Sequence, residues 1–150
     1  MREIIAFEVG DKKFGFDISC MRSLENYREI TPVPGTPSCI LGQVQVRDTI
    51  YPVFDLHTML GMPKREVTET TKMIIVTSGE LSLVCVLDSV DKVFKLTDDK
   101  VKEFPEVART EGTRYVDYVV NYNDELMLIL DPKTMISPED YECVCQTDFE

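Results

Sequence analysis

Hydrophobic and polar residues alternate along most of the chain in short runs, and turn-forming residues separate these runs. Such alternation is typical of half-buried β-strands. Near the N-terminus Ile5, Phe7 and Val9 share one face, and Gly10-Asp11 then supplies a turn, because glycine tolerates positive φ. The apolar positions return with the same spacing over residues 14–18. The pattern therefore predicts a β-hairpin at this end of the chain.

Three further hairpins are predicted in the same way. They cover residues 40–53 with a turn near Asp48-Thr49, residues 73–87 with a turn at 78–80, and residues 115–130 with a turn at Asn123-Asp124. Residues 90–94 predict one more strand, whereas the proline-rich segment Thr31–Pro37 and the charged residues 97–112 predict irregular connections. Pro52 lies inside its run and predicts an edge strand or a bulge, since proline has no amide donor.

The two halves of the chain repeat one another in element order and in residues. In each half a hairpin, a connection and a second hairpin lead to an aspartate that is placed to cap a short helix. In the first half this helix covers residues 56–60, and Gly61 ends it. Residues 51–60 align with residues 127–136 so that three pairs are identical: Asp55 with Asp131, Thr58 with Thr134, and Met59 with Met135. Strand-to-helix junctions share some of these features in general. Because both the element order and the residues agree, a duplicated unit is favoured.

The duplication sets the expected fold class. Each unit would hold about five short strands in roughly 65 to 70 residues, and antiparallel strands in that number close into a small barrel. A barrel of this size is only marginally stable alone, so the two should share an interface with a groove between them. The sequence thus predicts an all-β fold of two packed five-stranded barrels with a few short helices.

Two places on the chain are candidates for contact with a partner. A short helical turn capped by Ser19 would place Met21 and Leu24 on one side, beside the expected groove. Methionine makes adaptable apolar contacts, but from the residues alone plain core packing is the favoured interpretation of both positions. Arg47 is a lone cation at a hairpin turn. Its alternative role is a structural hydrogen bond to nearby carbonyl or carboxylate groups.

Composition and charge narrow the functional classes. The formal net charge is -11, which disfavours binding to nucleic acid and to anionic membrane surfaces. No apolar run approaches the roughly 20 residues of a membrane helix, and Met1-Arg2-Glu3 does not begin a secretory signal, so we expect a cytoplasmic protein without direct membrane insertion. The tail after residue 138 contains five acidic residues and no Lys or Arg, and we expect it to be flexible.

Few residues in the sequence are candidates for catalysis or for metal binding. His57 is the single histidine, and in its predicted short helix we expect it to be solvated. The five cysteines include Cys143-Val144-Cys145, but a zinc site usually needs four ligands. Cys39 and Cys85 lie in apolar runs, where cysteine usually acts as a small buried hydrophobe. No glycine-rich phosphate loop is present, so we expect a binding module with no catalytic residues, metal or cofactor.

One stretch of the chain reads Gly42-Gln43-Val44-Gln45-Val46-Arg47-Asp48 and then Ile50-Tyr51-Pro52-Val53-Phe54-Asp55-Leu56. It resembles the most specific stretch of the CheW family, which is Gly-Val-Ile-Asn-Leu-Arg-Gly followed by Ile-x-Pro-Val-x-Asp-Leu. The resemblance to this family covers roughly residues 3–138. The segments that precede and follow also match the family pattern: Phe14-Gly15-Phe16-Asp17-Ile18, Met21-Arg22-Ser23-Leu24, Leu87-Asp88-Ser89-Val90-Asp91-Lys92-Val93 and Ile129-Leu130-Asp131.

The resemblance implies two intertwined SH3-like barrels in one domain of residues 1–138. The first barrel would span about residues 13–66 and the second about 67–136, with the N-terminal strand as a candidate member of the second. The implied function is a non-catalytic adaptor in chemotaxis arrays. Receptor tips would dock between the barrels, and the barrel ends would pair with the regulatory domain of the histidine kinase CheA or with other CheW-like domains. The implied receptor-coupling residues, to which Leu24 is added from its position, are Ile18, Met21, Arg47 and Val93.

Two positions depart from the family pattern. Ser23 stands where the family prefers glutamate, which predicts that this contact is absent or altered. Asp48 replaces a glycine, and we expect it to strain a turn that uses positive φ or to pair with Arg47. Two other hypotheses remain: the CheW-like module of a CheV-type protein without its receiver, and a small-barrel hydrolase, which the lone His57 disfavours.

Overall fold

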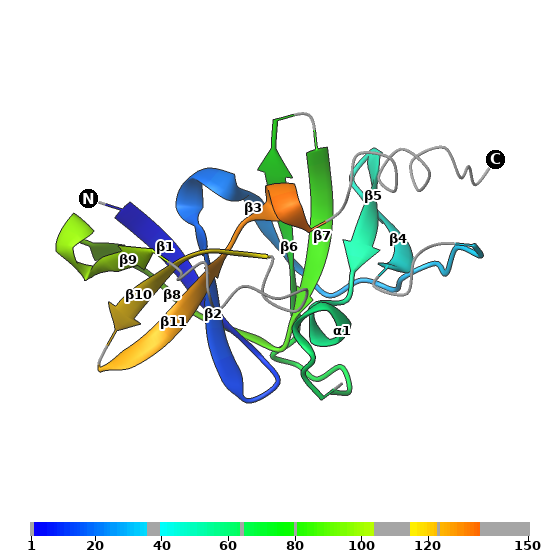
Figure 1. Cartoon of the computed structure of the whole chain (residues 1–150). Helices are drawn as coiled ribbons and strands as arrows, with labels where there is room; N and C mark the ends of the chain where they lie inside the picture. The colour runs from blue at the N-terminus through cyan, green and yellow to red at the C-terminus, as the bar shows by residue number, and fades with distance from the viewer. Residues whose placement is uncertain are drawn as a thin grey trace.

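The computed structural model describes residues 2–35, 40–63, 65–79, 81–103, 115–122 and 124–135. It is built almost wholly from β-strands in two sheets that lie side by side (Figure 1). The all-β class with a few short helices is therefore confirmed. Cys39, Cys143, Cys145, residues 36–37 of the proline-rich segment and the acidic tail lie outside the described residues.

All four predicted hairpins and the additional strand are present, with bounds close to those expected. The strands are β1 Arg2–Val9, β2 Lys12–Asp17, β3 Met21–Asn26, β4 Ile40–Val46, β5 Thr49–Phe54, β6 Lys72–Ser78, β7 Leu81–Leu87, β8 Ser89–Leu96, β9 Val101–Glu103, β10 Val116–Tyr122 and β11 Glu125–Leu130. The helical segments are η1 Ile18–Cys20, α1 Leu56–Leu60, η2 Asp98–Lys100 and η5 Pro132–Thr134, of which only α1 is an α-helix. In the described part of the chain, no helix is long and apolar enough to cross a membrane.

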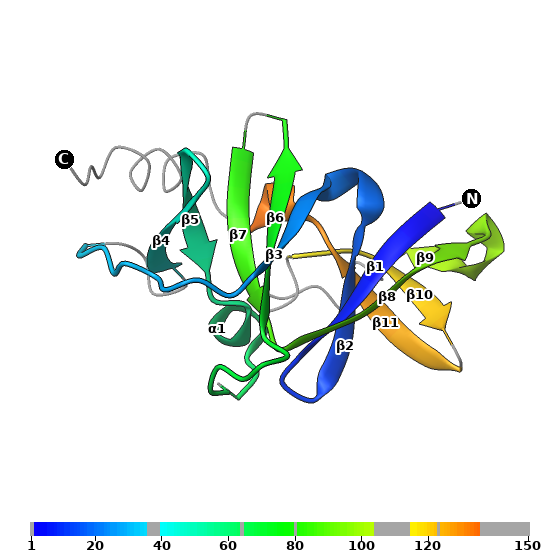
Figure 2. The ribbon, with the colours of Figure 1, turned by 180° about the vertical axis from the view of Figure 1, so that it is seen from behind.

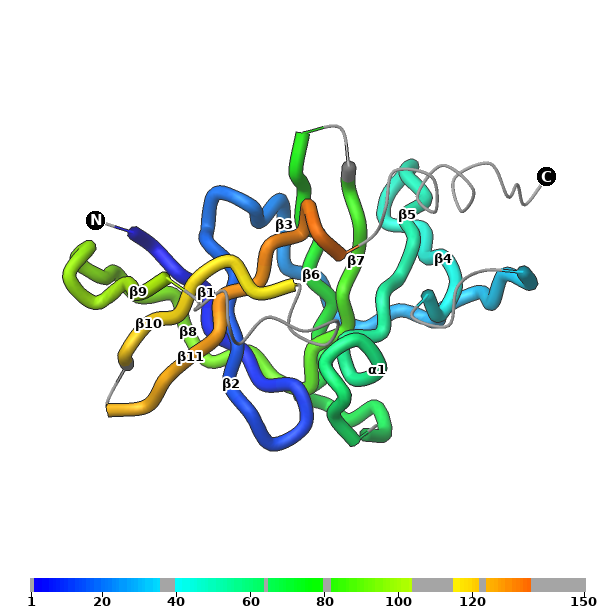
Figure 3. The backbone as a smooth tube through the Cα atoms, viewed as in Figure 1, coloured from blue at the N-terminus to red at the C-terminus, as the bar shows by residue number. Residues whose placement is uncertain are grey.

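The two sheets exchange strands between the halves of the chain. The six-stranded sheet has the order β8-β1-β2-β11-β10-β9, and the five-stranded sheet has the order β3-β6-β7-β5-β4. The chain starts in the first sheet, crosses to the second after β2, and returns at Asp88, between β7 and β8 (Figure 3). Strand pairing thus crosses the division expected near residue 66, and each sheet contains a hairpin from each half.

Within each sheet, the two outer strands are connected to each other. In the six-stranded sheet the outer strands β8 and β9 are consecutive and linked through η2. In the five-stranded sheet the chain beyond β3 reaches β4, where Thr31 and Gln43 exchange two backbone hydrogen bonds of 2.9 and 2.8 Å. These connections bring the two margins of each sheet together, as barrel closure requires.

The core has three parts because the strands alternate between two buried faces. In β1, Ile4 and Ala6 point into a cluster inside the six-stranded sheet, whereas Ile5 and Phe7 point into a cluster shared by both sheets. A third cluster fills the five-stranded sheet and includes Met73. The shared cluster is the largest of the three and takes side chains from both sheets, so it holds them together.

The repeated strand-to-helix junctions adopt matching structures. The Asp55 carboxylate accepts a hydrogen bond from the His57 amide and caps α1, and Gly61 ends this helix with φ 69°. The Asp131 carboxylate accepts from the Lys133 amide and caps η5 in the same way. The strands that precede the two caps, β5 and β11, each pair in parallel with a strand of the other half. The duplicated element order is confirmed.

Three local predictions need correction. Residues 97–112 were expected to be irregular, but η2 and the short strand β9 lie among them. Met21 and Leu24 lie in strand β3 and not in a helical turn, because the turn ends at Cys20. Of the two alternatives for Pro52, the edge strand is wrong, since β5 lies between β4 and β7. Proline is tolerated there because β5 pairs with β7 only at Val53 and Phe54. A register shift does interrupt the β4–β5 pairing close by, between Ile40 and Gly42 of β4.

Candidate functional site

The first crossing between the sheets carries two of the predicted receptor-coupling residues. Its turn, η1, is capped by Asp17, whose carboxylate accepts hydrogen bonds from the Ser19 amide at 3.0 Å and from the Ser19 hydroxyl at 2.9 Å. The capping residue is therefore Asp17 and not Ser19. Ile18 begins this turn and Met21 follows it, and both are partly buried against the shared cluster. The structure thus brings these two residues to one apolar site.

A bulge in β3 places Met21 and Leu24 on the same face. Met21 pairs with Val76 and Leu24 with Ile74, and Arg22 is the extra residue that shifts the register between them. Directly paired residues project to the same side of a sheet. Val76 and Ile74 belong to the shared cluster, so Met21 and Leu24 both face the other sheet. Leu24 remains 41% exposed because β3 is an outer strand.

Strand β8 repeats this arrangement in the other sheet. Val90 pairs with Phe7 and Val93 with Ile5, with a register shift between the two pairs. Phe7 and Ile5 also belong to the shared cluster, so both valines project to the side that faces the five-stranded sheet. Val93 is 47% exposed. β3 and β8 are the equivalent outer strands of the two sheets (Figure 2).

Four side chains thus form two matched sets, which we call the apolar edge pairs: Met21 with Leu24, and Val90 with Val93. Each pair has an inner member packed against the shared cluster and an outer member that is largely exposed. Val90 was not among the predicted residues. Val90 and Val93 are three residues apart, as are Met21 and Leu24. This repeated spacing is the sequence feature from which Val90 could have been predicted.

Arg47 occupies the two-residue turn between β4 and β5, where its φ is 58°. Its guanidinium lies 3.3 Å from the Glu25 carboxylate, and its side chain is 71% exposed. We expected Asp48 either to have a positive φ or to pair with Arg47. Instead Arg47 itself has the positive φ, and its ion pair is with Glu25. The Ser23 hydroxyl first, and then the charge of Arg47, lower the pKa of Glu25. Arg47 lies on the five-stranded sheet close to β3, apart from Val93 on the six-stranded sheet.

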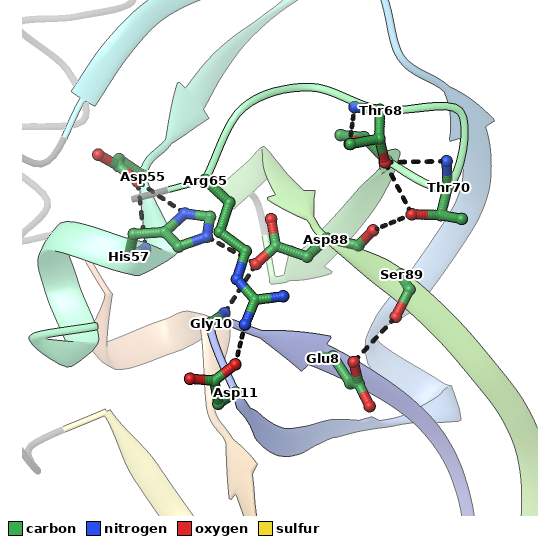
Figure 4. Close-up of polar contacts among 11 residues, drawn as sticks. Glu8, Gly10, Asp11, Asp55, His57, Arg65, Thr68, Thr70, Asp88 and Ser89 are labelled. Atoms are coloured by element: carbon green, nitrogen blue, oxygen red, sulfur yellow. Dashed lines mark hydrogen bonds and ion pairs between the residues drawn. The ribbon is translucent and has the colours of Figure 1, made fainter. Parts of the chain in front are cut away.

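A buried polar cluster lies at the second crossing (Figure 4). The Asp88 carboxylate accepts a hydrogen bond from the Gly10 amide at 2.7 Å and lies 2.8 Å from Nε2 of His57. Nδ1 of His57 lies 3.4 Å from the Asp55 carboxylate. The expectation of a solvated His57 is wrong, since its side chain is only 6% exposed. Its helix begins against the β7–β8 turn, and this long-range contact left no signal in the local sequence.

The groups of this cluster bond to other protein groups. A cavity of about 140 Å³ lies beside it, lined in part by Tyr27, Ile30 and Val67. This volume is smaller than the roughly 300–1,000 Å³ of typical small-molecule sites. Among the residues that the structure describes, no group of three or more His, Cys, Asp or Glu side chains is arranged to hold a metal ion. Cys85 is buried as predicted, and burial raises the pKa of its thiol.

Comparisons with known proteins agree with this architecture. The CheW-like domain family matches residues 3–139. The chain belongs to this family. The chemotaxis protein CheW of Klebsiella aerogenes is 26% identical over 143 residues, which cover 95% of this chain and 86% of that protein. The chemotaxis protein CheW of Bacillus subtilis is 24% identical over 137 residues, which cover 91% of this chain and 88% of that protein.

A solved CheW structure has the same fold. The scaffolding protein TtCheW from Thermoanaerobacter tengcongensis superposes with a TM-score of 0.79 at 25% identity, and the match covers 87% of this chain and 88% of that one. This CheW-like chain is a chemotaxis scaffold or coupling protein. The CheV alternative is not favoured, because these relatives are CheW proteins.

Proposed function

We propose that the chain joins chemoreceptors to the histidine kinase CheA and that it does so without catalysis. The main support for this proposal is that the two apolar edge pairs lie on equivalent outer strands of two packed sheets. A symmetric, partly exposed apolar surface suits a helical receptor tip that inserts its own apolar side chains. The polar cluster around His57 supports a non-catalytic role, because its groups bond to protein atoms on several sides.

Receptor tips would contact Ile18 and the apolar edge pairs, and Arg47 would supply the charged contact. Leu24 and Val93 keep 41% and 47% of their surface exposed, so both have apolar area left to bury in a complex. A guanidinium has five N–H donors, and Arg47 is 71% exposed beside Glu25. Its remaining donors are therefore accessible to carboxylate or carbonyl groups of a partner.

The remaining parts of the proposal concern partners and placement in the cell. The ends of the two sheets would pair with the regulatory domain of CheA or with other CheW-like domains. Residues 1–138 would act as one domain in the cytoplasm, held at membrane receptor arrays through these partners. The formal net charge of -11 supports partners other than nucleic acid or anionic lipid.

The receptor part is tested by replacing the outer members of the edge pairs. We expect Leu24→Ser and Val93→Ser each to weaken binding of a receptor cytoplasmic tip in calorimetry, and the double variant to weaken it further. Val67→Ser is the matched control, because Val67 is 53% exposed but lies on the segment after α1 and in neither outer strand. Equal weakening by all three single variants would contradict the assignment.

A further inference from the structure

The two crossings between the sheets are held in different ways. The chain crosses at η1 and again at Asp88, and the two crossings lie at opposite ends of the interface (Figures 1 and 2). At η1 the contacts with the shared cluster are apolar, through Ile18 and Met21. At Asp88 a single residue separates a strand of one sheet from a strand of the other, and its contacts are polar.

Asp88 contacts both sheets through its side chain. Its Oδ2 accepts from the amide of Gly10, in the β1–β2 turn of the six-stranded sheet, at 2.7 Å. The same oxygen lies 2.8 Å from Nε2 of His57, in the helix that follows β5 of the five-stranded sheet. A carboxylate only accepts hydrogen bonds, so the imidazole N–H is the donor. One oxygen atom therefore links an element of each sheet.

The backbone of Asp88 is also held on two sides. Its amide donates to the Glu8 carbonyl at 3.0 Å, and its carbonyl accepts from the Thr70 hydroxyl at 2.9 Å. Arg65, on the same connection as Thr70, forms an ion pair with Asp11 in the β1–β2 turn (Figure 4). The side chain of Asp88 is only 11% exposed, so its hydrogen bonds are shielded from water.

The second copy of the strand-to-helix junction has no buried residue equivalent to His57. Lys133 occupies the position in η5 that His57 occupies in α1, and it is exposed. Its helix is capped in the same way by Asp131. The duplicated scaffold therefore places a buried imidazole–carboxylate contact at the Asp88 crossing, whereas the corresponding residue near the η1 crossing projects to solvent.

We propose that Asp88 is a positioning residue that fixes the angle between the two sheets. Because β8 starts directly after Asp88 and carries Val90 and Val93, this angle sets how the two apolar edge pairs lie relative to each other. The effect on receptor binding rests on the proposed function, whereas the effect on sheet geometry does not.

The direct test is the relative orientation of the sheets in Asp88→Asn. This variant keeps the size of the side chain but removes the charge, and an amide cannot accept from both Gly10 and His57 as well as a carboxylate does. Backbone residual dipolar couplings report the orientation of each sheet in solution. We expect one alignment tensor to fit both sheets of the wild type, and two differently oriented tensors to be needed for Asp88→Asn, while each sheet alone still fits.

Asp91→Asn is the matched control. Asp91 lies three residues further along the chain and pairs at 3.3 Å with Lys13, but both residues belong to the six-stranded sheet. We expect this variant to fit a single tensor. A single tensor for Asp88→Asn as well would overturn the proposal. If Asp88→Asn does not fold, His57→Gln is measured in the same way. If neither variant folds, Asp88 is a determinant of folding and the positioning role is refuted.

Calorimetry with a receptor tip separates this inference from the proposed function. We expect Asp88→Asn to raise the dissociation constant about tenfold, within the usual range of coupling between distant sites, and Asp91→Asn to leave it unchanged. If the wild type does not bind the tip, the proposed function fails while the result on sheet orientation stands. If the sheets reorient but the tip binds with unchanged affinity, the sheet angle does not control the receptor surface.

Discussion

Replacing Gly42 with alanine tests how the five-stranded sheet is closed. Gly42 has φ 154°, and a Cβ atom built on it would lie 2.1 Å from the Thr31 carbonyl oxygen. That oxygen accepts one of the two hydrogen bonds that join the chain beyond β3 to β4. The obstacle is backbone and not a flexible side chain, so Gly42→Ala must push this segment away and break the connection.

The size of the effect follows from these contacts. Two backbone hydrogen bonds contribute about 0.5–1.5 kcal/mol each. The unfavourable φ at alanine adds about 1–3 kcal/mol. We therefore expect Gly42→Ala to lower the free energy of unfolding by about 2–6 kcal/mol. Gly79→Ala is the control, since Gly79 has φ 61° but open space where its Cβ would lie. It should cost only about 1–2 kcal/mol.

Urea unfolding of the two variants, followed by far-UV circular dichroism, measures the difference. We expect a lower midpoint for Gly42→Ala with little change in slope, because the rest of the fold remains. Binding to a receptor tip should weaken as well, since the closure brings β3 with Glu25 close to Arg47. Equal losses of stability in the two variants would mean that the clash with Thr31 has no energetic consequence and that the Thr31–Gln43 connection does not stabilise the sheet.

Two further predictions concern individual side chains. Burial, as the main cause, raises the pKa of Tyr118 to about 12 from the usual 10.0, so its contribution to stability is present below pH 10 and is lost as the pH rises towards 12. Urea unfolding across this range should show that loss in the wild type and a smaller one in Tyr118→Phe; equal losses would contradict the assignment. Arg47→Ala removes an exposed guanidinium, while Glu25, whose side chain is only 9% exposed, keeps Arg28 as a partner at 3.5 Å. The free energy of unfolding should therefore change by less than about 1 kcal/mol, while receptor binding weakens in calorimetry. A loss of stability that accounts for the loss of binding would instead assign Arg47 a structural role.

Local features were predictable because short stretches of sequence determine them. The hairpins follow from alternation and turn residues, and the caps at Asp55 and Asp131 follow from the preference of aspartate for helix starts. The exchange of strands between the halves was not readable from composition or periodicity, because it depends on pairing between distant segments such as β1 and β8. This exchange was predicted only from the resemblance to the CheW family, which implied intertwined barrels.

In the candidate site, too, local features were predictable and long-range contacts were not. Met21 and Leu24 were predicted to share a side for a helical reason, whereas they share it because Arg22 is bulged out of a strand. Three-residue spacing is compatible with both structures, and the sequence alone could not separate them. His57 was expected in solvent because its neighbours in the sequence give no sign of Asp88, 31 residues away. The five predicted receptor-coupling residues remain a prediction that binding measurements must test.

The proposed function requires one chain to bind a receptor and a kinase at the same time. Sequential calorimetry with the wild-type chain measures this, by titrating first a receptor cytoplasmic tip and then the CheA regulatory domain into the resulting complex. We expect both to bind, and the kinase domain to bind the receptor-loaded chain about as tightly as the free chain, because the proposed surfaces are separate. If either partner does not bind, or if the two exclude each other, the chain does not link them.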